Sequence, residues 1–243
     1  MGRVIMSGIV PTLKAPVTGV LASSLAVGST VKLMEGGTAV EYLVVNQGKP
    51  SGSSLYDDSC DGTWLLRKYI YAMTSWHWVD RNVYETSTIN TYLNDTFFNG
   101  FGSVEQEVIK QVKIPYRSGG GSGGTDQSGA NGLSCKAFLL GVAEVGGAGT
   151  YGYSTDGAKL SYFQSGTGDS ANEKRIAYYS GAAKDWWFRS PYIVDTDNVG
   201  AADRSGNCSG SPASVSSVGM RPALILPKTA LFDETSLLLK GVK

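Results

Sequence analysis

The sequence predicts an α+β fold with small antiparallel sheets, two helices and long irregular loops. Short apolar runs bounded by glycine or proline recur along the chain, and such runs are typical of strands. Helical patterns longer than one turn occur at residues 87–115, and much of the remaining chain is rich in glycine and serine. Of the 243 residues, 32 are glycine and 13 are tyrosine, while only 17% are charged. We therefore expect a sheet-rich, loop-heavy protein rather than a helical cytosolic enzyme.

The N-terminal segment is expected to be extended. Residues 1–24 contain Pro11 and Pro16 among isolated aliphatic residues, which argues against a helix. Such an arm docks onto a neighbouring subunit, onto another component of a particle, or onto the sheet of its own domain. We divide the chain into an arm for attachment or oligomerisation (1–27), one domain (28–227) and a C-terminal tail (228–243).

Three strands are expected next. Residues 30–34 and 39–45 alternate apolar and polar positions on either side of the Gly36-Gly37 turn, which is the pattern of a β-hairpin. Residues 63–67 form a short apolar run that fits a buried strand.

Two helices should follow. Residues 87–101 place apolar side chains at positions i, i+4 and i+8, namely Ile89, Leu93 and Phe97. Ser103 then caps a second helix, with Gln106 in the capping-box position. Its buried face should consist of four aliphatic residues, Val104, Val108, Ile109 and Val112. Pro115 prevents the helix from continuing.

The glycine-rich segment 118–132 is expected to be a flexible surface loop. It lacks the Lys-Ser or Lys-Thr ending and the following helix that a phosphate-binding loop requires. A strand is predicted over 136–140, a single helical turn over 142–145, and further irregular chain over 146–172.

The region 185–227 organises the rest of the chain. Two apolar runs, 185–191 and 219–227, read as buried strands and bracket a polar segment, 192–218, which we call the display segment. A long irregular segment held between two strands suits contact with another molecule.

Aromatic residues and arginine anchor interfaces, while asparagine and aspartate adapt to them. The contact candidates are therefore Tyr192, Asp195, Asp197, Asn198, Arg204 and Asn207. Four residues of the bracketing runs are assigned to the scaffold: Trp186, Trp187, Arg189 and Arg221. Adjacent tryptophans on a strand point to opposite faces, so at least one should be core. The two arginines should brace the segment through charge-assisted hydrogen bonds.

Composition excludes several classes of function. The 21 basic and 21 acidic residues cancel, so the chain has no electrostatic footprint for nucleic acid or an anionic membrane. No run approaches the ~20 apolar residues of a membrane span, and the N-terminus does not resemble a secretory signal. Cys60, Cys135 and Cys208 are odd in number and far apart, which favours free thiols over a disulfide framework or a metal site. His77 is the only histidine and is expected to be a packed residue rather than a catalytic base.

Five motifs, in one order, resemble those of a known family. They are Thr63-Trp64-Leu65-Leu66-Arg67, Tyr92-Leu93-Asn94, Phe138-Leu139-Leu140 with Glu144-Val145, Trp186-Trp187-Phe188-Arg189-Ser190-Pro191, and Gly219-Met220-Arg221-Pro222-Ala223-Leu224. Over roughly residues 28–227 the chain resembles C-type-lectin-like domains of phage structural proteins and bacterial surface proteins. The resemblance implies a lectin-like α+β fold whose loops carry the ligand surface. Related phage receptor-binding proteins vary the residues just ahead of a Gly-x-Arg-Pro-Ala strand, which corresponds here to 192–218.

The same broad fold includes the formylglycine-generating enzyme, an oxidase that requires a close pair of cysteines, and Cys208 has no neighbouring cysteine. Sugar-binding C-type lectins use calcium motifs that this chain lacks. Asp195 to Asn198, with Gly200 and Asp203, is the best calcium candidate, but it lacks the closing glutamate of a calcium loop. We expect no cofactor and no metal, with calcium as the remaining alternative.

Three functions stay open. The first is a phage virion protein on the particle surface that binds a bacterial surface glycan or protein. The second is a capsid or tail decoration or fibre protein with a structural role. The third, an oxidase, is least favoured because the sequence offers no paired carboxylates, nucleophile motif or metal spacing. Expected partners are other virion proteins, contacted through the arm, and further copies of this chain in a homo-oligomer, guessed to be a trimer.

Overall fold

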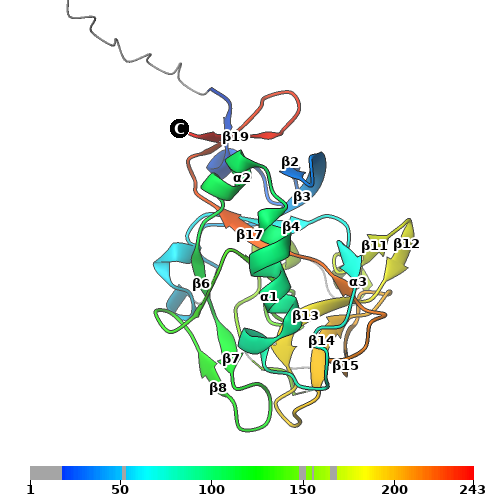
Figure 1. The fold of residues 1–243 in the computed structure, drawn as a ribbon. Helices are drawn as coiled ribbons and strands as arrows, with labels where there is room; N and C mark the ends of the chain where they lie inside the picture. Colours follow the sequence, from blue (N-terminus) through cyan, green and yellow to red (C-terminus); the bar gives the residue numbers. More distant parts are fainter. Residues whose placement is uncertain (1–17, 51–52, 148–151, 155, 165–168) are drawn as a thin grey trace, which may run out of the picture.

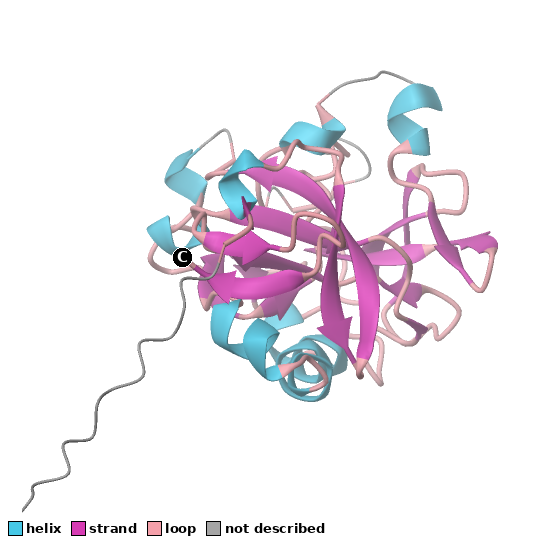
Figure 2. Ribbon diagram, turned by 90° about the horizontal axis from the view of Figure 1, so that it is seen from above, coloured by secondary structure: helices cyan, strands magenta, loops and turns pink. Residues whose placement is uncertain are grey.

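A computed structural model describes residues 18–50, 53–147, 152–154, 156–164 and 169–243. The expected α+β class is wrong, because strands account for 38% of the structure and helices for 17%, so the protein is mostly β. The helices are short, and the recurrent apolar runs pair with one another in several small sheets (Figure 1). Figure 2 shows the strands in the middle of the molecule with the helices around them.

A central sheet of five strands has the order β10-β17-β4-β3-β2. In that order its strands are Ala137–Phe138, Ala223–Leu226, Thr63–Arg67, Thr38–Gln47 and Thr30–Glu35. The predicted hairpin is confirmed, because Glu35 pairs with Thr38 across Gly36-Gly37. Both glycines have φ between 57° and 77°, a backbone conformation that glycine adopts without strain. The strand predicted over 136–140 shrinks to two paired residues, although Leu139 and Leu140 remain buried.

A second sheet of five strands has the order β15-β14-β13-β16-β5. Its strands are Cys208–Pro212, Asn198–Ala202, Trp186–Pro191, Gly219–Met220 and Ala72–Met73. The two bracketing runs meet here, since Trp186 pairs with Gly219 in parallel. The second run then divides, because β16 stays in this sheet while β17 enters the central sheet. The run 219–227 therefore ties the two sheets together.

The first and the last described strands belong to one sheet. In a third sheet, β18 (Ala230–Phe232) lies between β1 (Val20–Leu21) and β19 (Leu239–Val242). Residues 18–23, expected in the attachment arm, thus lie against the segment expected to be a tail. Gln47 Nε2 also donates to the carbonyls of Ala22 and Leu25. Residues 1–17 of the expected arm lie outside the described residues.

Four helices complete the described fold, together with short 3₁₀ turns. They are α1 (Thr88–Tyr92), the π-helical η5 (Leu93–Phe97), α2 (Ser103–Val108) and α3 (Asp169–Glu173). The turns are η1 (Ala22–Ser24), η2 (Ser53–Leu55), η3 (Asp58–Cys60), η4 (Tyr84–Thr86) and η6 (Ser161–Phe163). The helix predicted over 87–101 is confirmed as α1 followed by η5. Its predicted apolar stripe is buried, and the Ser87 side chain accepts the Asn90 N–H at its start. No helix in the described ranges is long and apolar enough to cross a membrane.

The second helix exists, but its cap and its buried face differ from the prediction. Gly102 is the N-cap, and Gln106 donates to the carbonyls of Asn99 and Phe101 instead of closing a capping box on Ser103. Val104 is exposed, whereas Glu105 is buried because it accepts the N–H of Met34 in the neighbouring hairpin. A tertiary hydrogen bond therefore sets the rotation of this helix.

Three two-stranded sheets lie around this frame. They are β6 (Val112–Ile114) with β9 (Leu133–Cys135), β7 (Tyr116–Ser118) with β8 (Thr125–Gln127), and β11 (Ala177–Tyr179) with β12 (Ala182–Lys184). The expectation of a flexible loop over 118–132 is wrong, because the segment forms the β7–β8 hairpin and its Gly120 and Gly121 pack against the protein. Gly121 donates to the Asn82 side chain at 2.9 Å, and a Cβ built on Gly121 would lie 1.8 Å from the carbonyl oxygen of Tyr192. Glycine is needed there because two backbones approach closely.

Candidate functional site

The display segment is a β-hairpin rather than a long irregular loop. Strands β14 and β15 pair over five residues each, from Asn198 opposite Pro212 to Ala202 opposite Cys208. The small side chains of Ala201 and Ala202 are buried, and the turns at either end are largely exposed. The segment is thus held by a sheet, and two turns carry its accessible side chains.

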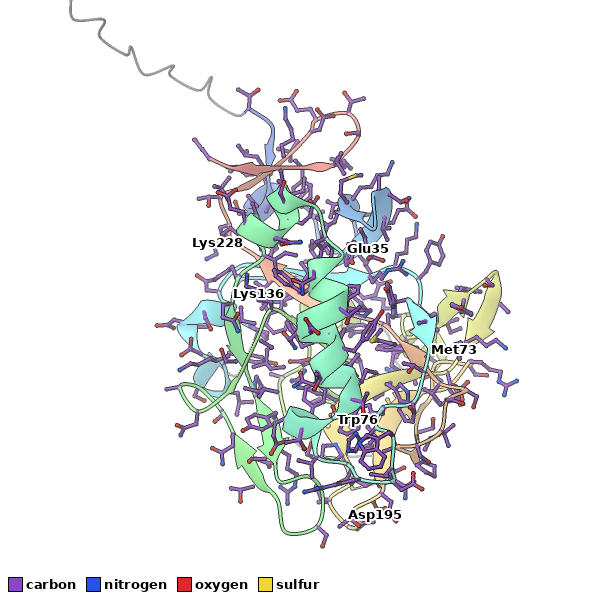
Figure 3. All side chains as sticks on the ribbon, viewed as in Figure 1. Glu35, Met73, Trp76, Lys136, Asp195 and Lys228 are labelled. Atoms are coloured by element: carbon purple, nitrogen blue, oxygen red, sulfur yellow. The ribbon has the colours of Figure 1, made fainter. Side chains whose placement is uncertain are left out.

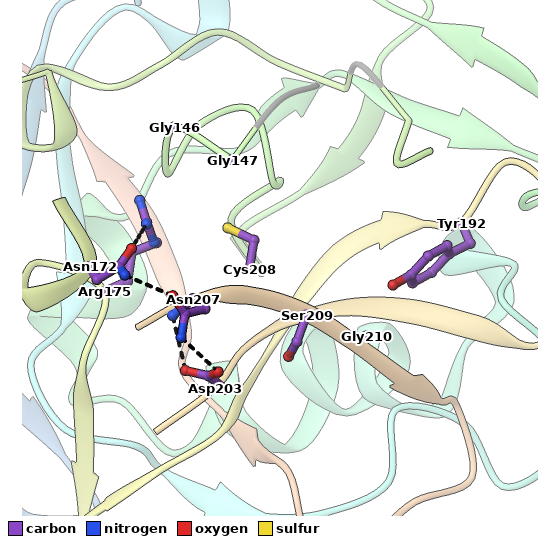
Figure 4. Close-up of a pocket in the computed structure, with 10 residues that line it drawn as sticks. All are labelled: Gly146, Gly147, Asn172, Arg175, Tyr192, Asp203, Asn207, Cys208, Ser209 and Gly210. Atoms are coloured by element: carbon purple, nitrogen blue, oxygen red, sulfur yellow. Dashed lines mark hydrogen bonds between the residues drawn. The ribbon is translucent and has the colours of Figure 1, made fainter. Parts of the chain in front are cut away.

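A pocket of about 560 Å³ opens beside this hairpin. Figure 4 shows it bounded by the display segment on one side and by two segments from elsewhere in the chain on the other. The lining residues are Gly146, Gly147, Asn172, Arg175, Tyr192, Asp203, Asn207, Cys208, Ser209 and Gly210. Its volume lies within the range of small-molecule sites, and its lining is mainly polar.

Arg175 provides the positive charge of the pocket. It follows α3 and is only 7% exposed. Its guanidinium donates to the carbonyl oxygens of Gly206 and Val145, at 2.6 and 3.1 Å, and to the Asn172 side chain. The indole of Trp186 donates to the Arg175 carbonyl at 2.7 Å. The predicted scaffold tryptophan therefore fixes the backbone of this pocket residue.

Tyr192 lines another side of the pocket and is packed against Tyr153. The ring centroids of Tyr192 and Tyr153 lie 4.6 Å apart and their hydroxyl oxygens 3.1 Å apart. A Cβ built on Gly210 would meet the Tyr192 ring at 2.1 Å, so glycine allows this ring to lie over β15. The ring is held by packing before any ligand arrives.

The predicted contact residues do not gather at one place. Tyr192 and Asn207 line the pocket, and the Arg204 side chain is exposed on the turn beside it. Asp195, Asp197 and Asn198 lie at the turn that leads into β14, where Tyr192 N donates to the Asn198 carbonyl at 3.0 Å. Figure 3 places Asp195 at the end of the molecule that also carries Trp76.

The carboxylate of Asp195, part of the calcium candidate, is engaged by its own turn. Its oxygens accept the N–H groups of Asp197 and Asn198 and the side-chain amide of Asn198, at 2.9 to 3.0 Å. In the described part of the chain, no group of three or more histidine, cysteine, aspartate or glutamate residues could hold a metal ion.

Three exposed apolar side chains lie on the two segments that meet at this second turn. Val194 is 72% exposed, Ile193 is 40% exposed and Trp78 is 74% exposed. The segment carrying Trp78 runs along the display segment, because Asn82 N donates to the Thr196 carbonyl and the Asn82 side chain donates to the carbonyls of Asp195 and Asn198. We call Trp78, Ile193 and Val194 the apolar rim.

Arg189, predicted as scaffold, lies in a fully buried ionic cluster. It binds Glu144 through two hydrogen bonds of 2.6 and 2.8 Å, and it also donates to the carbonyls of Pro115 and Leu139. The carboxylate of Asp156 lies 3.4 Å from Arg189 Nε. Burial raises the pKa of Asp156 to about 7, while the charge of Arg189 lowers it. Because the cluster is sealed from solvent, it holds β13 in place rather than meeting a substrate.

The other scaffold residues are also buried. Trp186 and Trp187 are both fully buried, whereas the alternation of side chains along a strand required only one of them to be in the core. Arg221 stacks on the Trp186 ring at 4.9 Å and donates to the carbonyls of Arg67 and Lys68. Burial lowers the pKa of Arg221 to about 10. The two arginines therefore brace the sheets beneath the display segment rather than the segment itself.

His77 is nearly buried, and the three cysteines are not paired in disulfides. His77 Nδ1 lies 2.9 Å from the Thr88 hydroxyl at the start of α1, and burial lowers its pKa. The three cysteines are free thiols. Burial raises the pKa of Cys208, which disfavours the reactive thiolate.

Sequence reasoning missed the part of the pocket that lies outside the display segment. Asn172 and Arg175 follow a glycine- and serine-rich stretch whose pattern carries no strand or helix signal. For the buried ionic cluster, the sequence contained one indication. Glu144 stands within a run of aliphatic residues, and a buried carboxylate requires a partner. No sequence pattern identified Arg189 as that partner.

Comparison with known proteins assigns the chain to a family. Residues 61–228 match a family described as a domain of unknown function, DUF6273. The match covers more than half of the chain, so the chain belongs to this family. No curated protein and no solved structure matches it.

Proposed function

We propose that this DUF6273 protein is a recognition protein of a phage particle that presents its display segment to a receptor on the bacterial surface. One observation carries the proposal. The display segment contributes residues both to the pocket and to the apolar rim, and Tyr192 of the pocket directly precedes Ile193 and Val194 of the rim.

The hairpin is built on a rigid base. Strand β13, which leads into it, is fully buried and is fixed by Arg189 and by the indole hydrogen bonds of Trp186 and Trp187. A rigid base lowers the ordering cost of binding, since the contact residues are positioned before the partner arrives. The display segment therefore has the properties of a preorganised contact surface.

The apolar rim suits a macromolecular partner. Interfaces concentrate their binding energy in a few residues, among which tryptophan is enriched. Trp78 is largely exposed next to the turn that carries Ile193 and Val194, although each of these side chains favours burial. Contact with a receptor would bury them.

The location on a phage particle is a separate part of the proposal. It rests on the resemblance of the strand motifs to those of phage structural proteins and on the low-charge, tyrosine-rich composition. Electron microscopy of particles carrying this chain, with an antibody against the display segment, tests it. Label on the particle surface supports the location, and particles free of the chain contradict it.

Binding of the purified protein to whole bacterial cells tests recognition. The double variant Ile193→Ser, Val194→Ser should lose at least about tenfold in affinity, because it removes two exposed apolar contacts without touching the core. Tyr69→Ala with Tyr178→Ala is the matched control, since both tyrosines are exposed and lie outside the display segment. Equal binding by both double variants would refute recognition through the display segment.

A further inference from the structure

We propose that the pocket binds a small, singly charged carboxylate that also carries hydroxyl groups, with Arg175 as the carboxylate anchor. This inference rests on the proposed function, because it names the ligand class of the same display segment.

Arg175 has unused hydrogen-bonding capacity. A guanidinium carries five N–H groups. Three of them are used by Gly206, Val145 and Asn172, one each from Nε, Nη1 and Nη2. One N–H on each terminal nitrogen is left without a partner among the described residues, which matches the two hydrogen bonds that a bidentate carboxylate accepts.

The charge of Arg175 also lacks a counter-charge in the described part of the chain. Its three acceptors are two backbone carbonyls and a side-chain amide, all neutral. The described carboxylates lie beyond ion-pair distance from it. A cation that is almost fully buried is costly unless it is paired. An arriving carboxylate supplies the missing negative charge in a pocket that is open to solvent on one side.

The remaining lining defines the rest of the ligand. Ser209 and Tyr192 bring hydroxyl groups. The amides of Asn172 and Asn207 bond to each other at 2.7 Å, and each keeps one further N–H for a ligand hydroxyl. Asp203 places a negative charge in the same wall, where it is held by the N–H groups of Ser205 and Asn207. That charge repels a second negative charge on the ligand, so a monoanion is favoured over a phosphate dianion.

Three related probes separate these features: glucuronate, glucose and glucose 6-phosphate. Titration calorimetry on the full chain should show that glucuronate binds at least about tenfold more tightly than either of the others, as expected for a charge-assisted pair. Equal binding of glucuronate and glucose would overturn the role of Arg175. Tighter binding of glucose 6-phosphate would overturn the preference for a monoanion.

Two variants locate the effect. Arg175→Gln should remove the preference for glucuronate over glucose while leaving the affinity for glucose within about twofold. Arg204→Gln is the matched control, because Arg204 lies on the turn beside the pocket with its side chain exposed, and it should keep the preference. A preference lost in both variants would indicate a general field effect and overturn the assignment to Arg175.

A measurement on the unaltered protein covers the case in which Arg175→Gln fails to fold. Cys208 lines the pocket, whereas Cys60 and Cys135 are buried, so iodoacetamide on the native protein should modify Cys208 first. Glucuronate should slow this reaction and glucose at equal concentration should not. Absence of protection by glucuronate would overturn the proposal.

The two proposals fail separately. If cell binding depends on Ile193 and Val194 but glucuronate shows no preference, the ligand class is wrong and recognition stands. If glucuronate binds through Arg175 and cells are not bound, recognition is wrong and the pocket assignment stands.

Discussion

The buried ionic cluster allows a sharp prediction about stability. Replacing Arg189 by methionine removes the cation that pairs with the fully buried Glu144 carboxylate, together with the two hydrogen bonds of 2.6 and 2.8 Å from Arg189. Only the neutral donors Tyr56 OH and Gly141 N–H then remain on that carboxylate. The substitution also leaves the carbonyl oxygens of Pro115 and Leu139 without this donor. Removing one partner of a buried pair costs about 3–5 kcal/mol. For a chain of this size, that corresponds to a drop of roughly 6–20 °C in Tm.

Urea unfolding followed by tryptophan fluorescence measures this loss, since five tryptophans report on the core. Arg221→Met is the matched control, because Arg221 is also buried but donates only to backbone carbonyls, so its loss should be about 1–3 kcal/mol. Adding Glu144→Gln to Arg189→Met should recover at least about 1 kcal/mol relative to additivity, since the stranded charge is then neutral. A loss below about 1 kcal/mol in Arg189→Met, or strict additivity in the double variant, would refute this account of the cluster.

Three further predictions concern pH, close packing and recognition. Burial raises the pKa of Asp156 to about 7 from 3.8, so between these pH values the folded state holds a proton that the unfolded chain releases. The stability due to Asp156 should be complete below about pH 4 and should fall, by at most about 1.4 kcal/mol per pH unit, as the pH rises to 7. Asp156→Asn should remove this slope when the free energy of unfolding is measured against pH. Gly121→Ala should lower the urea midpoint more than Gly123→Ala, because a Cβ at Gly121 meets the Tyr192 carbonyl oxygen at 1.8 Å. A Cβ at Gly123 meets nothing within 4 Å and costs only the strain of its positive φ. Equal midpoints would contradict the packing of this turn. Trp78→Ala should weaken cell binding by at least about tenfold. It should change the free energy of unfolding by less than about 0.5 kcal/mol, since the side chain is largely exposed. A large loss of stability would assign Trp78 to the core instead.

Local patterns in the sequence were sufficient for elements that neighbouring residues define. The hairpin around Gly36-Gly37 and the first helix follow from side-chain period and turn chemistry, and both are confirmed. The burial of the Trp186-Trp187 run follows from its apolar character. These features depend on contacts within a few residues, which a sequence displays directly.

Long-range pairing decided the rest. The protein is mostly β because short apolar runs far apart in the chain hydrogen-bond to one another, and no local pattern fixes which runs pair. Glu105 is buried because a distant backbone N–H, that of Met34, requires an acceptor. The glycine turn at Gly121 is packed because the Tyr192 backbone passes beside it.

By itself, the sequence determined where apolar runs, turns and polar segments lie, and it indicated 192–218 as the segment to inspect. Only the tertiary structure decided that this segment is a hairpin, that Asn172 and Arg175 complete a pocket beside it, and that Glu144 and Asp156 surround Arg189. The physical reason is that a pocket and a buried ion cluster are made by groups separated by tens of residues. Their meeting is fixed by how the sheets assemble, which no single stretch of chain encodes.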